Sequence, residues 1–458
     1  MENLVAIILA AGEGKRMKSK KAKVTHKICG KALVECVYNS AVGAGADECV
    51  VVIGHGADQV RECLGEKVTY AVQEEQLGTG HAVKQAESFL KGRSGYALLL
   101  CGDTPLITAQ TLASAVKYHK DNCNSATVIT ADMENPYGYG RIIRDEHGNL
   151  LKIVEHRDAT DEEKAVKEIN SGMYCFTIAH LLEALNEINN NNDQGEYYIT
   201  DTIEILLSKG LKVGAMKICD SSEIMGINDR VQLAEASNIM KKRIIVEHMK
   251  AGVTIIDPST TYIDLGVEIG SDTVIYPGTM LQGSTCIGED CEIGPNTRIV
   301  DSAIGNGCDV VNSVVIESTV GTDTHIGPFA YIRPQSSIGS NVKIGDFVEI
   351  KKSVIGDRTK ISHLTYIGDA ELGKNINVGC GVVVVNYDGK KKNKTIVGDN
   401  AFIGCNSNLV SPVVIKDNAY IAAGSTITED VPEYSLAIAR ERQVIKENWV
   451  IKKGMERK

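Results

Sequence analysis

The stretch IDLGVEIGSDTVIYPGTMLQGSTCIGEDCEIGPNTRI, residues 263–299, places an aliphatic side chain at every sixth position. An α-helix cannot keep that period on one face, because it completes a turn in about 3.6 residues. A six-residue period with glycines and small polar residues between the aliphatic positions is typical of a parallel β-helix. The aliphatic positions of the stretch are Ile263, Ile269, Ile275, Leu281, Ile287, Ile293 and Ile299.

The same period continues towards the C-terminus after a few five-residue slips. Its later aliphatic positions are Ile326, Ile332, Ile338, Ile344, Ile350, Ile355, Ile361, Ile367, Val397, Ile403, Leu409, Ile415, Ile421 and Ile427. We therefore predict a β-helix over residues 251–438 and a C-terminal arm over residues 439–458. A repeat of this kind can serve as a stacking or oligomerisation scaffold alone, so its function must be judged from the residues that interrupt it.

The N-terminal half of the chain has a different pattern of apolar residues. Short apolar runs at Val5–Leu9, Glu48–Ile53 and Ala97–Leu100 alternate with longer amphipathic stretches, which predicts buried parallel strands joined by helices. This pattern indicates a Rossmann-like α/β domain over residues 1–229, with helices on both faces of its sheet. Residues 230–250 contain neither proline nor glycine and are predicted to form a linker helix.

Composition excludes several classes of function. The net charge of −10 argues against a nucleic-acid partner, because phosphate backbones are bound by basic surfaces. The 13 cysteines include no Cys-x-x-Cys pair, which favours reduced thiols over a zinc or disulfide framework. No stretch approaches the roughly 18 apolar residues that a membrane helix needs. We expect a cytoplasmic protein without a membrane partner.

The segment LAAGEGKRM, residues 9–17, directly follows the first predicted strand and is expected to open a helix. Its glycines let backbone amides approach a phosphate, a helix N-terminus would favour the phosphate charge, and Arg16 would pair with it. A plain strand-to-helix turn is the alternative interpretation. The dinucleotide-binding fingerprint requires glycine at the position of Met17, so a nicotinamide or flavin cofactor is not expected.

Together with Lys23, this segment resembles the signature of sugar-1-phosphate nucleotidyltransferases. Further matching motifs follow in the same order as in that family: Gln73, QLGTG at 76–80, Gly102-Asp103, YGR at 139–141, Val154-Glu155, EINSG at 168–172 and GIN at 226–228. Over essentially its whole length, the chain most resembles the bifunctional N-acetylglucosamine-1-phosphate uridyltransferase/glucosamine-1-phosphate acetyltransferases. This resemblance implies that the β-helix is left-handed, that the protein is a homotrimer, and that UTP and acetyl-CoA are co-substrates.

The resemblance also assigns roles in the N-terminal half. Residues expected to bind UTP or the sugar nucleotide are Leu9, Ala10, Ala11, Gly12, Arg16, Lys23, Gln73, Gly78, Thr79, Gly140, Glu155, Asn170 and Asn228. Among these, Gln73, Gly78 and Thr79 would hold the uracil, and Arg16 and Lys23 the phosphates. Gly140, Glu155 and Asn170 would position the sugar phosphate. Asp103 and Asn228 would hold Mg²⁺, which prefers a few oxygen ligands and retained waters.

In the β-helix, the six-residue repeat is interrupted by residues that the packing of the coils does not require. SHLTYIGD at 362–369 lies within a coil, and NYDG at 386–389 begins a charged excursion that runs to Lys394. By resemblance, His363 is the general base of acetyl transfer, and an ordinary histidine pKa near 6.5 suits proton transfer at neutral pH. The residues expected to bind glucosamine 1-phosphate are Arg333, Lys351, Tyr366, Asn377, Asn386, Tyr387 and Lys392.

The residues expected to contact acetyl-CoA include two departures from the family pattern. Cys380 stands where alanine is usual, and Cys405 stands where serine is common. A backbone contact would survive both changes, whereas a hydrogen bond from a serine hydroxyl would weaken with a thiol. The expected acetyl-CoA contacts are Cys380, Cys405, Ala423 and Arg440, the last through the phosphates of the coenzyme.

Three hypotheses follow for the whole chain. The first is a bifunctional enzyme that acetylates glucosamine 1-phosphate and then transfers UMP from UTP, releasing UDP-N-acetylglucosamine and pyrophosphate. The second is a nucleotidyltransferase whose β-helix only assembles or regulates it. The third is a binding scaffold without catalysis. The residues at 362–369 and 386–389 argue against the second hypothesis, and Lys23, Asp103 and Asn228 argue against the third.

Overall fold

The computed structural model describes residues 3–192 and 194–456. The chain divides into two compact units, Met1–Lys242 and Arg243–Lys458. Helix α9, Arg230–Lys250, contains the division between them. Among the described residues, no helix is both long enough and apolar enough to cross a membrane.

The first unit is built on a nine-stranded sheet whose main strands follow the order β11-β7-β10-β6-β1-β4-β5. The predicted strands are confirmed, and β1 pairs in parallel with both β4 and β6. The strand bounds are β1 Asn3–Ala10, β4 Glu48–Ile53, β5 Thr69–Val72, β6 Gly95–Cys101, β7 Ala126–Asp132, β8 Arg141–Arg144, β9 Leu150–Val154, β10 Glu168–Thr177 and β11 Val213–Lys217.

The sheet is mixed, which differs from the parallel arrangement predicted. Strand β10 runs antiparallel to both β6 and β7. A parallel strand would need a crossover, usually a helix, to carry the chain back across the sheet. The chain between β7 and β10 instead forms the antiparallel hairpin β8–β9 and the single-turn helix α6, Asp161–Lys164.

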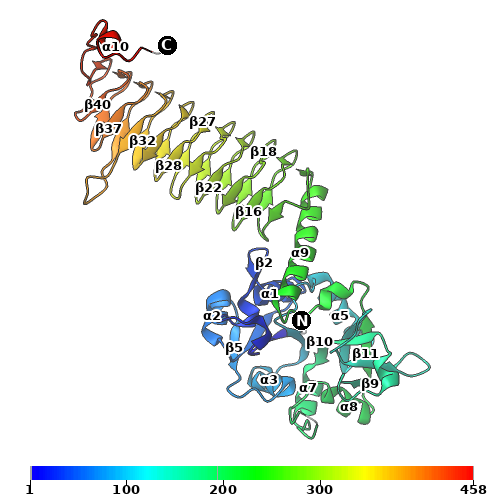
Figure 1. Ribbon diagram of the computed structural model, residues 1–458. Helices are drawn as coiled ribbons and strands as arrows, with labels where there is room; N and C mark the ends of the chain where they lie inside the picture. The colour runs from blue at the N-terminus through cyan, green and yellow to red at the C-terminus, as the bar shows by residue number, and fades with distance from the viewer. Residues whose placement is uncertain (1–2, 193, 457–458) are drawn as a thin grey trace. The chain divides into compact units, whose positions relative to one another are not determined.

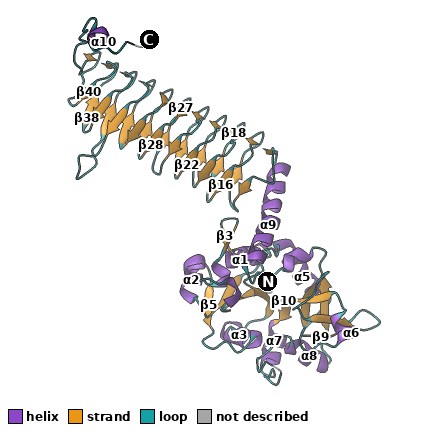
Figure 2. Ribbon diagram, viewed as in Figure 1, coloured by secondary structure: helices purple, strands orange, loops and turns teal. Residues whose placement is uncertain are grey.

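Helices cover both faces of this sheet, as predicted (Figure 2). Alternate residues of β1 enter two separate cores: Val5 and Ile7 belong to one, and Ala6 and Ile8 to the other. The helix bounds are α1 Leu33–Gly43, α2 Ala57–Leu64, α3 Thr79–Gln85, α4 Glu87–Leu90, α5 Ala109–Asp121, α7 Ile178–Leu185 and α8 Asp201–Ser208. Because helices cover both faces, a ligand can reach the sheet only at the edge where its strands end.

The prediction that the segment after β1 opens a helix is wrong. That segment forms a single 3-10 turn, η1 (Lys15–Met17), and the first α-helix begins only at Leu33. Left-handed backbone at Gly14 (φ 67°) and Lys18 (φ 48°) limits η1 to one turn. The loop therefore offers backbone amides and basic side chains to an anion, without a helix dipole.

The second unit is the predicted left-handed β-helix, built from three parallel sheets of 11, 10 and 9 strands (Figure 1). Up to β37 (Asn408–Val410), each short strand of the prism pairs with the third strand after it, so that Ile275 lies opposite Ile293 and both are fully buried. At the end of the prism, β39 (Tyr420–Ile421) pairs with β41 (Leu436–Ala437) instead. The sheets run from β12 (Thr254–Ile255) to β41 (Leu436–Ala437), from β13 (Tyr262–Ile263) to β40 (Thr426–Ile427), and from β14 (Glu268–Ile269) to β38 (Val413–Ile415). The chain continues past the prism to helix α10, Trp449–Lys452.

Candidate active sites

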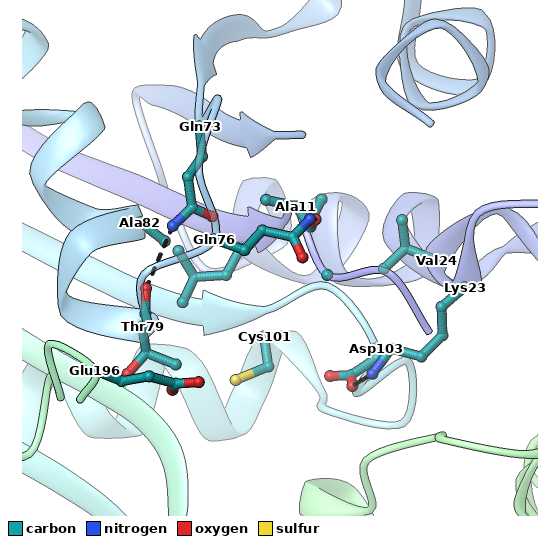
Figure 3. Close-up of a pocket in the computed structure, with 14 residues that line it drawn as sticks. Ala11, Lys23, Val24, Gln73, Gln76, Thr79, Ala82, Cys101, Asp103 and Glu196 are labelled. Atoms are coloured by element: carbon teal, nitrogen blue, oxygen red, sulfur yellow. Dashed lines mark hydrogen bonds and ion pairs between the residues drawn. The ribbon is translucent and has the colours of Figure 1, made fainter. Parts of the chain in front are cut away.

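A cavity of about 300 Å³ opens in the first unit beside the loop that follows β1 (Figure 3). Its lining includes many of the residues predicted to bind UTP and metal. The lining residues are Leu9, Ala10, Ala11, Gly12, Lys23, Val24, Gln73, Gln76, Gly78, Thr79, Ala82, Cys101, Asp103 and Glu196. Figure 3 shows Gln73 and Thr79 at one end of this cavity and Lys23 and Asp103 at the other.

The sheet brings the two ends of the cavity together. Strands β1 and β6 are parallel neighbours with Leu9 opposite Cys101, so the loops that follow both strands leave from the same edge. The Gly102 amide donates to the Leu9 carbonyl at 2.9 Å. A Cβ atom on Gly102 would lie 2.8 Å from that carbonyl oxygen, so glycine is required for Asp103 to follow at this point.

Hydrogen bonds shape the end of the cavity that contains Gln73. This side chain is 4% exposed, and its Nε2 donates to the Gly78 carbonyl at 3.3 Å and to His81 Nδ1 at 3.1 Å. Gln76 Nε2 donates to the Ala11 carbonyl at 2.8 Å, which ties this loop to the one after β1. The side-chain amides of Gln73 and Gln76, which we call the amide wall, are therefore held in place. Fixed amides of this kind suit the donor and acceptor pattern of a nucleobase.

The other end of the cavity concentrates charge. Lys23 Nζ forms an ion pair with Asp103 and lies 3.2 Å from Asn228 Oδ1. Arg16 Nη2 donates to the same Asn228 oxygen at 2.9 Å. The Ile227 amide donates to the Asp103 carbonyl at 2.9 Å, which anchors the GIN segment here. Two cationic side chains thus lie beside two oxygen donors, an arrangement of the kind that suits charge-assisted hydrogen bonds to phosphate.

The oxygen donors at this end also fit a divalent cation. Asp103 and Asn228 Oδ1 converge on one positive group, the Lys23 ammonium, from chain segments far apart in sequence. A carboxylate and an amide oxygen, completed by water and phosphate oxygens, make a donor set that suits Mg²⁺.

The three residues predicted to position the sugar phosphate lie together. The Asn170 amide donates to the Gly140 carbonyl at 2.9 Å, and a Cβ on Gly140 would lie 3.6 Å from Glu155 Oε1. Burial raises the pKa of Glu155, and the charges of Asp158 and Asp201 add to the effect. This group adjoins the cavity, because Cys101 Sγ donates to the Gly172 carbonyl at 3.4 Å.

The sequence did not indicate that Glu196 lines the cavity beside β1. Its loop is docked onto the QLGTG segment: the Tyr197 amide donates to the Leu77 carbonyl at 2.8 Å, and the Gly80 amide donates to the Tyr197 carbonyl at 2.8 Å. These residues are far apart in sequence, and no local motif links them. Cys101, Val24 and Ala82 likewise join the lining only through packing.

In the β-helix, three of the residues predicted to bind a sugar phosphate, Arg333, Lys351 and Tyr366, lie in or directly after successive strands of the 10-stranded sheet, which are β25 (Tyr331–Ile332), β28 (Glu349–Lys351) and β31 (Tyr366–Gly368). Arg333 Nη1 pairs with Glu349 Oε1 at 2.7 Å, and Lys351 Nζ lies 4.0 Å from Asp369 Oδ2. The neighbouring Lys392 ammonium lowers the pKa of Lys351. Lys392 and Asp369 also line a cavity of about 260 Å³. Crowded cations of this kind are stabilised by an anion placed between them.

The loop that begins at Asn386 is anchored next to this basic cluster. Asn386 is 6% exposed, and its Nδ2 donates to Asp369 Oδ2 at 2.6 Å and to the Tyr366 hydroxyl at 3.4 Å. The exposed Tyr387 donates from its hydroxyl to the Gly389 carbonyl at 2.8 Å, which holds the loop in shape. Tyr366 and Asn386 are thus brought together as predicted.

His363 ends strand β30 (Lys360–His363) in the 11-stranded sheet, and Tyr366 begins β31 (Tyr366–Gly368) after a two-residue corner. The imidazole Nδ1 lies 2.5 Å from Asp346 Oδ1, a carboxylate that sequence reasoning missed. Asn377 lies in β33 (Asn377–Val378), on the sheet of His363 and away from the strands that carry Lys351 and Tyr366.

The residues predicted to bind acetyl-CoA continue from His363 along one edge of the prism. The Gly381 amide donates to the His363 carbonyl at 3.4 Å, which places Cys380 on the adjacent coil. The Asn406 amide donates to the Cys380 carbonyl at 2.7 Å, which places Cys405 on the coil after that.

Two further coils extend the same edge. The Gly424 amide donates to the Cys405 carbonyl at 2.8 Å, so Ala423 stands directly beyond Cys405. A Cβ on Gly424 would lie 3.6 Å from Arg440 Cδ. The four predicted positions therefore form a column that starts at His363 and ends at a cationic side chain.

Comparison with known proteins agrees with both halves of this description. Residues 5–221 match the nucleotidyl transferase family, residues 266–301 and 394–429 match the bacterial transferase hexapeptide family (six repeats), and residues 317–403 match the GMPPB C-terminal domain. The chain is 68% identical over 457 residues to the bifunctional protein GlmU of Acetivibrio thermocellus, covering 100% of this chain and 99% of that protein. It is 63% identical over 457 residues to GlmU of Caldanaerobacter subterraneus subsp. tengcongensis, covering 99% and 100%, and 58% identical over 454 residues to GlmU of Clostridioides difficile, covering 99% of each. The family resemblance seen in the motifs is confirmed, and this chain belongs to the GlmU family of bifunctional enzymes, which join a uridyltransferase to an acetyltransferase.

Proposed function

We propose that the cavity beside β1 binds UTP with its base near Gln73, Gly78 and Thr79 and its phosphates near Arg16 and Lys23. The amide wall at Gln73 and the paired cations at the opposite end support this orientation. The backbone of Leu9–Gly12 would contact the nucleotide between these two ends.

The sugar phosphate would enter beside Gly140, Glu155 and Asn170, which adjoin this cavity through Cys101. A phosphate oxygen of N-acetylglucosamine 1-phosphate forms a bond to the α-phosphorus of UTP, the bond to the β-phosphate oxygen breaks, and pyrophosphate leaves. Arg16 and Lys23 hold the triphosphate and offset its charge, while the sugar-binding residues align the attacking oxygen.

Asp103 and Asn228 are the residues proposed to hold Mg²⁺. When bound, the ion supplies charge neutralisation for the triphosphate. Lys23 would then exchange its ion pair with Asp103 for contacts with phosphate oxygens, a change that its flexible stem permits.

The β-helix would acetylate glucosamine 1-phosphate before UMP transfer. Arg333, Lys351 and Lys392 would hold the sugar phosphate, and Tyr366, Asn386 and Tyr387 would complete the pocket, with Asn377 proposed to contribute from its own sheet. His363 would take a proton from the amine as its nitrogen bonds to the acetyl carbon. The carbon–sulfur bond breaks, and the proton passes to the departing thiolate of coenzyme A.

The observation that carries this proposal is the column from His363 through Cys380, Cys405 and Ala423 to Arg440, beside the basic cluster. A base, an anion site and an extended edge with a terminal cation are what acyl transfer from a long phosphorylated thioester requires. A prism that only assembled the protein would have no use for them.

We further propose that the protein is a homotrimer that acts in the cytoplasm, where UTP and acetyl-CoA are available. The exposed rings of Phe329 and Phe347 support the trimer. They stack with centroids 5.5 Å apart at a corner of the prism, beside Asp346. An exposed pair of stacked aromatic rings is suited to burial against a second copy of the chain.

Two variants test the proposed assignment of one reaction to each unit. His363→Ala should lower acetyl transfer to glucosamine 1-phosphate, followed as free coenzyme A thiol, by about 10²-fold or more, since general-base contributions are of that order. Its UMP transfer to N-acetylglucosamine 1-phosphate, followed as pyrophosphate, should stay at the parent level.

Asp103→Ala should show the opposite pattern, with Mg²⁺-dependent pyrophosphate release lost and acetyl transfer kept. Full pyrophosphate release by this variant would overturn the metal assignment. Loss of both activities in a folded His363→Ala protein would show that the two reactions do not have separate sites.

A further inference from the structure

Asp346 and His363 form a cross-strand pair on the 11-stranded sheet of the β-helix. Asp346 ends β27 (Lys343–Asp346) and lies in register with His363 at the end of β30. The two side chains meet on the outer surface of the prism, with Asp346 Oδ1 at 2.5 Å from His363 Nδ1. Asp346 has no part in the function proposed above.

The backbone is built to bring these two residues together. A Cβ on Gly345 would lie 2.0 Å from the Ser362 carbonyl oxygen, so glycine is needed for the two strands to approach here. The Leu364 amide donates to the Asp346 carbonyl at 3.0 Å, which extends the pairing past the side-chain contact. The register of the pair is therefore set by main-chain contacts before either side chain is considered.

In the single chain the pair lies at the surface, with 57% of the His363 side chain and 37% of the Asp346 side chain exposed. Exposed ion pairs contribute little to folding stability, so stability does not account for the contact. The hydrogen bond from His363 lowers the pKa of Asp346, so the carboxylate is charged throughout the neutral range.

We propose that Asp346 is a positioning residue for acetyl transfer, which accepts the Nδ1 proton of His363 and thereby leaves Nε2 unprotonated and facing the amine. An imidazole with Nδ1–H bonded to a carboxylate has one tautomer and one ring orientation. The inference rests on the proposed role of His363 as the base. Nε2 takes the proton from the amine, and Asp346 stabilises the imidazolium without itself being protonated.

The groups that contact His363 determine what a substitution of Asp346 removes from the surroundings of the imidazole. On β27 the charged group facing the imidazole is Asp346, and on the following coil the Gly381 amide meets the His363 carbonyl. Replacing the carboxylate by an amide keeps an oxygen acceptor for Nδ1–H and removes the charge. Replacing the whole Asp346 side chain by the methyl group of alanine removes both the acceptor and the charge.

The test compares Asp346→Asn and Asp346→Ala by steady-state acetyl transfer in the full-length protein. For Asp346→Ala we expect kcat to fall by about 10-fold or more, because the imidazole loses the group that fixes its tautomer and ring orientation, with KM for glucosamine 1-phosphate nearly unchanged. Asp346→Asn should keep more activity, and the acidic limb of its pH–rate profile should move to lower pH, because the imidazolium loses its anionic neighbour.

Asp309→Asn is the matched control. Asp309 lies opposite His325 on the same sheet, 3.3 Å from its Nδ1, in a similarly exposed pair that no proposed substrate contact includes. This variant should keep the parent kcat and pH profile. Uridylyl transfer and the thermal unfolding midpoint should be unchanged in all three variants.

The outcomes separate this inference from the function on which it rests. If His363→Ala is inactive in acetyl transfer and Asp346→Asn keeps the parent kcat and pH profile, the positioning role is wrong while the base assignment stands. If His363→Ala keeps its activity, the base assignment itself fails. A drop in kcat without a shift of the acidic limb in Asp346→Asn also overturns the proposal, because the charge would then have no effect on the base.

Discussion

Individual glycines in both sites are required by the residue that stands opposite them. A Cβ on Gly14 would lie 2.6 Å from Lys23 Cβ, so this glycine of the LAAGEGKRM segment makes room for the lysine that reaches Asp103. Gly345 stands against the Ser362 carbonyl in the same way. The sequence indicates that such glycines matter, but only the structure shows that close packing of a functional segment is the reason.

His119 is a buried residue whose titration should make the first unit sensitive to acid. It is fully buried, with Nδ1 3.0 Å from Thr127 Oγ1 and Nε2 3.2 Å from Thr177 Oγ1. Burial, with smaller contributions from His180 and Lys120, lowers its pKa to about 4. The unfolded chain takes up this proton below its ordinary pKa near 6.5. The free energy of unfolding should therefore fall by up to about 3 kcal/mol as pH drops from about 6.5 to 4.

The measurement is urea unfolding at several pH values, followed by the helical circular dichroism signal. His119→Gln removes the titrating group, so its unfolding free energy should depend less on pH than that of the parent in this window. His147→Gln, at an exposed histidine, is the control and should retain the parent slope. Equal slopes for His119→Gln and the parent would contradict the assignment.

At the level of elements, the β-helix depends on stacking between successive coils. Ile332, Ile350 and Ile367 are register partners in the 10-stranded sheet, and each is almost fully buried. Lys351 follows Ile350 directly, so the position of an outward functional residue depends on the inward residue beside it. In a structure of this kind a coil is stabilised mainly by its neighbours, so a defect in one coil acts locally.

Ile350→Ala should destabilise this part of the prism by about 2–5 kcal/mol, the usual cost of removing a large buried aliphatic group. Acetyl transfer should be lost at a lower temperature than in the parent, while uridylyl transfer keeps its parent thermal profile. Val354→Ala is the matched control, because Val354 is 48% exposed and its loss leaves little cavity. Parallel loss of both activities in Ile350→Ala would show that the defect spreads beyond the β-helix.

At the scale of the whole molecule, each unit contains its own core and its own candidate site. The cavity beside β1 lies wholly within Met1–Lys242, and the His363 column lies wholly within Arg243–Lys458. Each proposed site can therefore act on a freely diffusing substrate, and acetylation must come first because the uridylyl acceptor is its product.

Mixing two variants that each lack one of the two activities tests this independence. Purified Asp103→Ala and His363→Ala proteins should each fail to make UDP-N-acetylglucosamine from glucosamine 1-phosphate, acetyl-CoA, UTP and Mg²⁺. An equal mixture should make it, because the first supplies N-acetylglucosamine 1-phosphate and the second consumes it. Product analysis by chromatography decides the result. No product from the mixture would mean that the intermediate must pass within one molecule.

Short-range periods and motifs were enough to predict the β-helix, the alternation of strands and helices in the first unit, and most of the residues around the cavity beside β1. Tertiary structure decided the antiparallel course of β10, the single turn after β1 and the docking of Glu196 beside the QLGTG segment. It also decided the Asp346–His363 contact. A six-residue period specifies which side chains point inward. Which outward side chains meet depends on the exact length of each coil and on contacts between segments distant in sequence.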